Sequence, residues 1–412
     1  MNNTFRTYIT TIALIMSTFA LGQNATSSPS SRFGVGELDE NVTNEYRAMG
    51  GTAIGMRRQS AINPAQPASY TACDSLSFMF DLAASAMWTN YGDANGQRNK
   101  ANGNLEYLML QFPIYKRYIA FAAGVMPYSS MGYDFQLSNT NFAHPYVVTY
   151  SGEGDISQAF GGLSVNICDW VALGANFYYM FGSMQNTTAL RFTDASISSS
   201  LMYRTMQVSN WRGRYGIQLF HTFAEKHKVV LGGMFESRLR MNGTYMQYEL
   251  NTLDSVIVTS DGFETPMIYG AGLSYAWNDR LLLAADYSCQ KWSNAKYFAR
   301  TGALSDRTRY SFGIEYRHNP YSRKYVEQVR WRAGFALTDY TATPSATLAA
   351  DYNTRHDYTI SLGVGLPLRT SQTMFNATVE YTRRQMLGIH ENVLQLTINA
   401  AIDEMWFMKR KL

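Results

Sequence analysis

Charges are scarce in this chain of 412 residues, and their scarcity limits the classes of protein it can belong to. Charged residues make up 16% of the sequence, against roughly 25% in an ordinary soluble domain. Lys and Arg total 35 and Asp and Glu total 31, which leaves a formal net charge of +4 without any basic run. We therefore expect no nucleic-acid binding.

Cysteine and histidine are also rare, which argues against several kinds of site. Cys73, Cys168 and Cys289 are odd in number, far apart and form no CxxC pair, so we expect neither a disulfide framework nor a redox site. The six histidines are scattered, with no pair at metal-ligand spacing and no nucleophile elbow nearby. We accordingly expect no metal site, no cofactor and no enzymatic activity.

Long hydrophobic runs are missing beyond the N-terminus. The first residues, MNNTFRTYITTIALIMSTFALGQ, combine a positive start at Arg6 with a short apolar stretch and small residues at Ala20 and Gly22. This pattern predicts a secretory signal peptide over residues 1–22. No later run reaches the roughly 18 apolar residues of a membrane-spanning helix, so we expect an exported chain without transmembrane helices.

What the chain has in abundance, from about residue 75 onward, is alternation with a period of two. In RTRYSFGIEYRH, apolar residues from Tyr310 to Tyr316 alternate with polar residues from Arg309 to Arg317. The polar positions are mostly Ser, Thr, Gly and Asn, whereas a soluble β-sandwich would expose Lys and Glu. Such strands are typical of a membrane barrel with a polar interior. Aromatic residues near the expected strand ends would form its interfacial girdles: Trp88, Tyr91, Trp170, Trp277, Trp292, Trp406 and Phe407.

The connections between the expected strands alternate between short and long. Short turns and long polar loops on opposite ends are typical of outer-membrane barrels, with the short turns in the periplasm. The pattern predicts an all-β fold: a transmembrane antiparallel β-barrel of about 14 strands over residues 75–404, followed by a periplasmic tail at 405–412. We expect a monomeric barrel in the outer membrane of a Gram-negative cell, with both termini periplasmic. Long loops are expected at 92–102, 137–154, 185–205, 251–262, 293–305 and 341–355, with HPYVVTY as a loop hairpin, and one strand is expected over 227–250.

A barrel of this size has a lumen too wide for its own wall side chains to fill. Residues 23–74 precede the first strand, are rich in Gly, Ala and Asn, and include the irregular stretch RQSAINPAQPASY. We interpret them as an N-terminal hatch, or plug, inside the lumen, where a polar wall can satisfy their backbone groups. The alternative is a disordered periplasmic leader, in which apolar Met49, Met56 and Ile62 would be out of place.

The order of these features resembles a known family. Gly50 and Gly51 in AMGGTAIG, then Asn63-Pro64-Ala65, then the long alternating region resemble the FadL/TodX-type outer-membrane transporters of hydrophobic compounds. The ending MWFMKRKL is similar to that of Bacteroidetes-type members. The resemblance implies a 14-stranded barrel with a hatch. It also implies passive transport of a fatty-acid-like or aromatic molecule, captured at outer loops and released by hatch movement through a lateral gap in the wall.

Candidate site residues follow from the resemblance. Asn63, Pro64 and Ala65, with Gly50 and Gly51, would gate the hatch. The family's lateral gap lies in the third strand, and VMPYSSMGYDF places Pro127 and Gly132 in that strand here. Proline removes a donor from the ladder and is confined to edges and bulges, so it can open the wall, although Pro127 could instead mark the outer end of the strand.

A second group of candidates consists of arginines on the polar faces of adjacent expected strands. They could bind the carboxylate of a fatty acid, or they could form an ion-pair ladder with acidic residues of the lumen. They are Arg309, Arg317, Arg330 and Arg332. Besides a hydrophobic ligand, the expected partners are membrane lipid and the barrel-assembly machinery. The alternative function is a scaffold of the same fold that serves a protein-secretion machine without small-molecule uptake.

Overall fold

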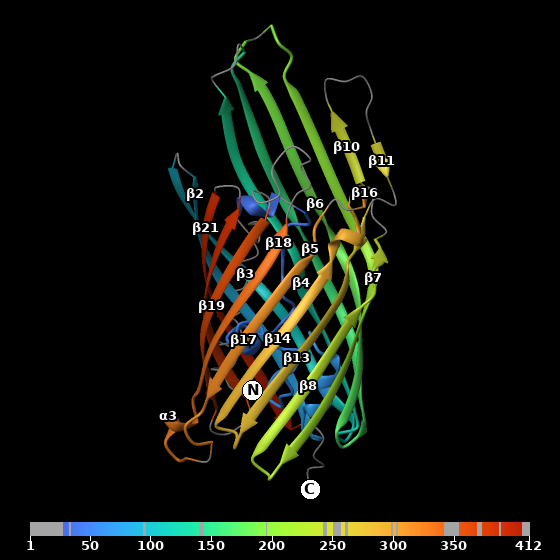
Figure 1. Ribbon diagram of the computed structural model, residues 1–412, viewed down its shortest axis with the longest axis vertical. Coiled ribbons are helices and arrows are strands. Elements are labelled where there is room, and N and C mark those ends of the chain that lie inside the picture. The colour runs from blue at the N-terminus through green and yellow to red at the C-terminus, as the bar shows by residue number, and fades with distance from the viewer. Residues whose placement is uncertain are drawn as a thin grey trace, which may run out of the picture.

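Alternating strands close into one antiparallel barrel in the computed structural model of the chain (Figure 1). The structure describes residues 28–32, 34–93, 96–139, 144–194, 196–241, 245–249, 257–259, 263–297, 300–301, 304–320, 322–341, 354–368, 373–386 and 389–405. Fourteen of the described strands form the wall, each paired with the next, and the last pairs back with the first. In chain order the wall strands are β2 (Ser77–Asp93), β3 (Gly96–Tyr115), β4 (Ile119–Asn139), β5 (Tyr146–Cys168), β6 (Val171–Phe192), β7 (Ser200–Phe223), β8 (His227–Glu236), β13 (Met267–Trp277), β14 (Leu281–Lys291), β17 (Arg307–Tyr316), β18 (Arg330–Thr341), β19 (Thr354–Pro367), β20 (Met374–Met386) and β21 (Ile389–Met405).

The remaining described elements are short and lie before the wall or in its connections. Before β2 come η1 (Pro29–Arg32), β1 (Glu37–Leu38), α2 (Asn44–Arg47) and η2 (Pro67–Ala72). Between β8 and β13 come β9 (Leu239–Arg240), β10 (Tyr245–Glu249), β11 (Ile257–Thr259) and β12 (Glu264–Thr265). After β14 come η3 (Trp292–Asn294), β15 (Lys296–Tyr297) and β16 (Arg300–Thr301), and α3 (Tyr325–Gln328) precedes β18. No helix in these ranges is long and apolar enough to cross a membrane.

The wall has an apolar outside and a polar inside. In β17, Phe312 and Ile314 point outward and are exposed, whereas Ser311 and Glu315 point inward and are buried. Strands of this kind need lipid on one face and polar partners on the other. The predicted barrel of about 14 strands is therefore confirmed, with its first strand beginning at Ser77 and its last ending at Met405.

The short turns predicted at one end of the barrel are also confirmed. The β3–β4, β7–β8 and β13–β14 hairpins turn through residues 116–118, 224–226 and 278–280. Each contains residues with positive φ, a conformation that Asn and Asp tolerate better than most side chains. These residues are Lys116, Ala224, Glu225, Asn278 and Asp279.

The other end of the barrel differs from expectation, because several predicted loops are strands. β4 and β5 stay paired as far as Asn139↔Tyr146, so HPYVVTY belongs largely to β5 and the loop hairpin was wrong. β2 and β3 pair through most of 92–102, and β6 and β7 pair up to Leu190↔Ser200. The strand expected over 227–250 instead ends at Glu236, and β10 then adds to β7. Alternation continues past the membrane because paired backbones satisfy their own polar groups there too. Figure 1 shows β4, β5, β6 and β7 rising beyond the rest of the wall.

Three of the expected girdle residues face outward, whereas Tyr91 was placed wrongly, because it is only 8% exposed, and Trp406 and Phe407 lie outside the described residues. Trp88, Trp170 and Trp277 are about half exposed on the outer surface. Trp292 was placed wrongly, because it lies in η3, 1% exposed, within an apolar cluster with Met and Tyr side chains. The expected signal peptide at 1–22, most of the tail at 405–412 and most of the loop at 341–355 lie outside the described residues.

Candidate functional site

The chain before the wall, residues 28–76 and here called the luminal segment, lies inside the barrel. Its side chains and amides reach opposite sides of the wall. Asn44 Nδ2 donates to the carbonyls of Asn376 in β20 and Thr397 in β21, at 3.2 and 3.3 Å. The Ile54 amide donates to Asp286 in β14 at 2.7 Å, and Tyr70 bonds Asn176 in β6 at 3.0 Å. Contacts in all these directions fill the lumen that the wall strands leave.

Eight inward-facing glycines bring the wall backbone against the luminal segment. A Cβ atom added at any of them would lie within 2.6 Å of an atom of the segment, closer than real side chains come. At Gly334, for example, it would lie 1.9 Å from the Gly50 nitrogen. Because only glycine leaves room for this approach, we call the set the glycine belt. Its members are Gly174 on β6, Gly216 on β7, Gly232 on β8, Gly270 and Gly272 on β13, Gly313 on β17, Gly334 on β18 and Gly363 on β19.

Ion pairs fasten the outer part of the luminal segment to the wall. Glu37 pairs with Arg355 at 2.8 Å and with Arg384 at 3.2 Å. Glu40 pairs with Arg307 and Arg309. Burial alone would raise the pKa of Glu40, but the two guanidinium groups outweigh it and lower the pKa to about 2. Glu40 is therefore a carboxylate over the whole physiological pH range.

Two more charge clusters fasten the centre of the segment. Arg47 pairs with Asp39 at 2.6 Å and with Glu106 of β3 at 3.0 Å. Arg58 pairs with Glu315 of β17, which also accepts from Arg332 of β18 at 2.6 Å. Buried charges persist only with such partners, so wall and segment depend on each other.

The Asn63-Pro64-Ala65 stretch lies at the centre of this packing. Asn63 is 1% exposed, donates to the Ala53 carbonyl at 2.8 Å and so closes a loop within the segment. The Pro64 carbonyl accepts from Asn176 Nδ2 at 3.0 Å and from the Tyr178 hydroxyl at 2.9 Å, both in β6. Ala65 is buried in the apolar cluster of the segment. These residues anchor the inner half of the segment to the wall.

Gly50 and Gly51 face the opposite side of the lumen. Both have positive φ, at 71° and 80°, which a side chain would strain. The Gly50 amide donates to Ser361 Oγ at 2.9 Å, and its carbonyl accepts from Arg309 Nη2 at 2.9 Å. Asn63-Pro64-Ala65 and the Gly50-Gly51 pair therefore hold the segment at separate points on the wall.

The wall is interrupted between β3 and β4, the strand that contains Pro127. β3 pairs with β4 only from Leu108↔Val125 down to the turn, although both strands continue outward. Above that point β3 pairs with β2 alone, and β4 has a register shift against β5 between Pro127 and Ser129. Pro127 lies where the pairing stops, which fits its missing donor. We call this interruption the β3–β4 gap.

The luminal segment covers the strand edge that the β3–β4 gap exposes. β1 pairs antiparallel with β4, with Glu37 opposite Ser130 and Leu38 opposite Ser129. On either side of this pairing, the Asp39 amide donates to the Tyr128 carbonyl at 2.9 Å and the Ser28 amide to the Gly132 carbonyl at 2.8 Å. Gly132 thus belongs to the covered edge. An exposed edge within a membrane would leave polar groups unpaired, and here part of the chain's own N-terminal region pairs with it.

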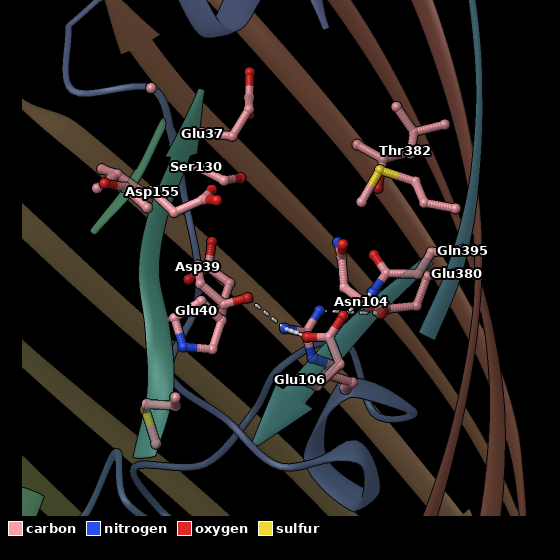
Figure 2. A pocket seen from close by; sticks show the side chains of 18 of the residues that line it. Glu37, Asp39, Glu40, Asn104, Glu106, Ser130, Asp155, Glu380, Thr382 and Gln395 are labelled. Atoms are coloured by element: carbon pink, nitrogen blue, oxygen red, sulfur yellow. Dashed lines mark hydrogen bonds and ion pairs between the residues drawn. The ribbon is translucent and has the colours of Figure 1, made fainter. Parts of the chain in front are cut away.

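A cavity of about 590 Å³ leads from the β3–β4 gap into the lumen. Its mouth is apolar, with Leu105, Leu108 and Val125 at the two edges. Figure 2 shows Asp39 and Glu40 on one side of the interior and Glu106 and Glu380 across from them. The interior has seven carboxylates and five guanidinium groups: Glu37, Asp39, Glu40, Glu106, Asp155, Asp357 and Glu380, with Arg47, Arg307, Arg309, Arg355 and Arg384. Each of these arginines contacts a carboxylate of the cavity, so none of its positive charge is left over.

The four arginines predicted as ligand-binding candidates do not come together in one patch. Arg309 lies in the cavity and pairs with Glu40 at 2.9 Å. Arg332 pairs with Glu315, and Arg330 donates to Ser60 at 3.1 Å. Arg317 and Arg330 line a second cavity at the short-turn end. Of the two interpretations of these residues, the ion-pair ladder fits the contacts of Arg309 and Arg332.

Sequence reasoning did not single out the charged residues of the segment or the glycines as a set. Glu37, Glu40 and Arg47 stand in a stretch without periodicity, GELDENVTNEYR, where nothing indicates their partners. The belt glycines occupied polar faces of expected strands and gave a weak signal, since glycine inside a strand often marks a close backbone approach. Among the described residues, no group of three potential metal ligands was found.

A family model described as BamG matches residues 4–412, nearly the whole chain. The chain belongs to the BamG family. No curated protein matches this BamG-family chain.

Solved structures show which fold this member of the BamG family has. The Pseudomonas aeruginosa FadL homologue is 13% identical, covers 89% of this chain and 99% of its own length, and superposes with a TM-score of 0.60. The toluene transporter TodX of P. putida is 13% identical over 90% and 100% of the two chains, with a TM-score of 0.58. The toluene transporter TbuX of Ralstonia pickettii is 14% identical over 89% and 99%, also at 0.58. The likeness is one of fold, and it confirms the FadL/TodX-type barrel predicted from the sequence.

Proposed function

We propose that this chain is a plugged outer-membrane conduit for hydrophobic small molecules, with a lateral exit at the β3–β4 gap. The observation that carries the proposal is the interrupted wall pairing above Leu108↔Val125, covered from inside by β1. The shared fold with proteins named as toluene transporters supports it. In this orientation the short turns face the periplasm, as in outer-membrane barrels generally.

Only the outer half of the luminal segment needs to move for lateral release. Residues 28–40 hold the β4 edge through a few backbone bonds and the ion pairs of Glu37 and Glu40. The inner half is fixed by the glycine belt and by Asn63-Pro64-Ala65. The hatch in this proposal is therefore residues 28–40, and Asn63, Pro64, Ala65, Gly50 and Gly51 act as its fixed base.

The side chains that line the cavity indicate which class of ligand it accepts. Its mouth is apolar, while its interior has two more carboxylates than guanidinium groups, seven minus five. A ligand carboxylate would find no unpaired guanidinium group there, because each arginine of the cavity already contacts a carboxylate. The arrangement favours an aromatic or otherwise neutral hydrophobic molecule, or one with a cationic end, over a fatty acid.

A disulfide across the gap tests the proposal. In a Cys168→Ser background, Leu38→Cys with Ser129→Cys joins two residues that lie opposite each other in the β1–β4 pairing. Cells that express the protein should take up the fluorescent hydrophobic probe phenylnaphthylamine faster than cells without it. Oxidation of the double variant should abolish this gain, and a reductant should restore it, because β1 can then leave the edge.

The matched control is a disulfide that leaves the gap free. Thr359→Cys with Thr382→Cys joins β19 to β20 at a pair whose hydroxyls already lie 3.0 Å apart. Its uptake should be the same oxidised or reduced. Equal probe uptake by cells with and without the unmodified protein would refute the conduit.

A second candidate function is a scaffold for outer-membrane protein assembly or secretion. The name BamG hints at a relation to the assembly machinery, and the cavity interior is charged where a hydrophobic conduit would be expected to be apolar. Native mass spectrometry of the tagged barrel, purified from its own membrane, separates the two functions. A stoichiometric assembly-machinery subunit without any bound small molecule would favour the scaffold.

A further inference from the structure

A second, larger cavity lies at the short-turn end of the barrel, below the luminal segment. It has a volume of about 1370 Å³, and we call it the vestibule. Its wall is strongly basic, in contrast to the acidic cavity at the β3–β4 gap. Eight basic and three acidic residues line it: Arg57, Arg58, Lys116, Arg117, Lys228, Arg280, Arg317 and Arg330, with Asp169, Asp279 and Glu315.

Several of these cations have no carboxylate to neutralise them. Arg57, Lys228 and Arg280 make no ion pair within 4.0 Å to any residue that the structure describes. Arg57 donates only to neutral groups, the Ala68 carbonyl at 2.9 Å, Thr71 and Asn166, and lies 4.1 Å from the centre of the Phe220 ring. Its guanidinium is thus held in place in the same cavity as Lys228, without an ion pair to any described residue. Like charges gathered in a confined space attract an anion.

A lipid cannot supply this anion from the side. At the short-turn end, β3 and β4 are paired from Leu108↔Val125 to Tyr115↔Ile119, so the β3–β4 gap does not extend to the vestibule. The other neighbouring wall strands are paired as well. The ligand must therefore enter along the barrel axis from the aqueous side.

Among the described residues, the only acidic side chains that line the vestibule are Asp169, Asp279 and Glu315. The stretches next to the short-turn end that lie outside the described residues are 369–372 and 406–412, which read RTSQ and WFMKRKL. They contain Arg369, Lys409, Arg410 and Lys411 and no Asp or Glu. An anionic ligand from another molecule would complement the positive charge that the described residues leave.

We propose that the vestibule is a docking site for an acidic peptide segment of a periplasmic partner protein. Its volume exceeds the roughly 300–1,000 Å³ of a small-molecule pocket, and its basic side chains come from five wall strands or their turns and from the luminal segment. A single small anion can contact only a few of these cations, whereas an extended acidic segment can contact many of them. The proposal goes beyond conduit activity and depends only on the orientation with short turns toward the periplasm.

The test uses the detergent-purified full-length chain and a rhodamine-labelled oligoglutamate peptide, with binding followed by fluorescence anisotropy. The unmodified protein should bind, with affinity falling steeply from about 50 to about 200 mM salt. Lys228→Gln should weaken binding about fivefold and Lys228→Glu more strongly, as expected for one charge contact removed or reversed. Heat-modifiable migration on a gel shows that each variant is folded. Arg280→Gln lies in an exposed turn. It gives a second measurement of peptide binding that does not depend on a residue inside the wall.

Lys100→Gln is the matched control, because it removes the same charge from an exposed position at the opposite end of β3. It should bind the peptide as the unmodified protein does. Equal affinities for all variants would overturn the proposal. Complete displacement of the peptide by inorganic phosphate of equal total charge would also overturn it, since the vestibule would then be a site for small anions.

Discussion

Gly334→Ala should loosen the luminal segment while leaving the wall intact. The added Cβ would lie 1.9 Å from the Gly50 nitrogen and 2.1 Å from the Met49 carbonyl carbon, both backbone atoms that cannot turn aside. Ordinary contact begins near 3.4 Å, so the segment must move by about 3.4 − 1.9 = 1.5 Å. Within β18 itself, alanine keeps its register opposite Gly313 and Ser361.

A shift of this size breaks the bonds that hold Gly50. The Gly50 amide donates a hydrogen bond to Ser361, and the Gly50 carbonyl accepts one from Arg309. Both hydrogen bonds are 2.9 Å long, and neither persists when the two atoms move a further 1.5 Å apart. A neutral hydrogen bond contributes about 1 kcal/mol and a charged one about 2 kcal/mol, and residual overpacking adds about 1 kcal/mol. The sum of about 4 kcal/mol raises the displaced fraction of the segment about a thousandfold.

Single-channel conductance in planar lipid bilayers measures this displacement. Channels of the Gly334→Ala variant should open often. Their conductance should not exceed that of a variant that lacks residues 31–72. Gly161→Ala is the control, because its Cβ would meet only the Phe121 ring, at 4.0 Å. If Gly334→Ala folds and conducts no more than the unmodified protein, the glycine belt does not hold the segment and the reasoning fails.

Two further predictions concern the charges of the lumen. Glu315→Gln should lower the free energy of unfolding by about 3–5 kcal/mol, because it leaves two buried guanidinium groups short of a carboxylate. Denaturant titration in detergent measures this change, with the exposed turn variant Glu225→Gln expected within about 0.5 kcal/mol of the unmodified protein. The pKa of Glu40, lowered from 4.5 to about 2, predicts that its stabilisation is complete above pH 4.5 and is lost as the pH falls toward 2. Conductance should therefore stay flat from neutral pH to about pH 5 and rise below pH 4.5, and a rise already between pH 7 and pH 5.5 would count against this role of Glu40.

Much of the wall could be predicted from the sequence because lipid and lumen impose opposite demands on successive residues. The alternation around Phe312 and the turn at Asn278 have a local cause, and each is visible in the chain. The extension of β5 through Tyr146 was missed because Thr, Tyr and Val alternate in the same way outside a membrane as within it. Local pattern does not reveal where the bilayer ends.

The contacts of the lumen could not be predicted because they form only when the barrel closes. Glu37 lies hundreds of residues from Arg355, and no periodicity links the two. Pro127 did indicate an irregular third strand. The strand that covers its edge, β1, has only two residues, which are too few to show alternation in the sequence. The pairing of Glu37 and Leu38 with β4 becomes apparent only in three dimensions.

The glycine belt also has a consequence for the order in which the protein is built. The belt glycines lie on strands from β6 to β19. At each of them, the space between wall and segment is too small for one methyl group. The segment cannot be inserted into so closely fitting a wall after the barrel has closed. Since the segment precedes every wall strand in the chain, it is present before the first hairpin forms, and the strands can be added around it until β21 meets β2. We therefore expect the last seam to close around a segment that is already in place and acts as an internal template for the wall.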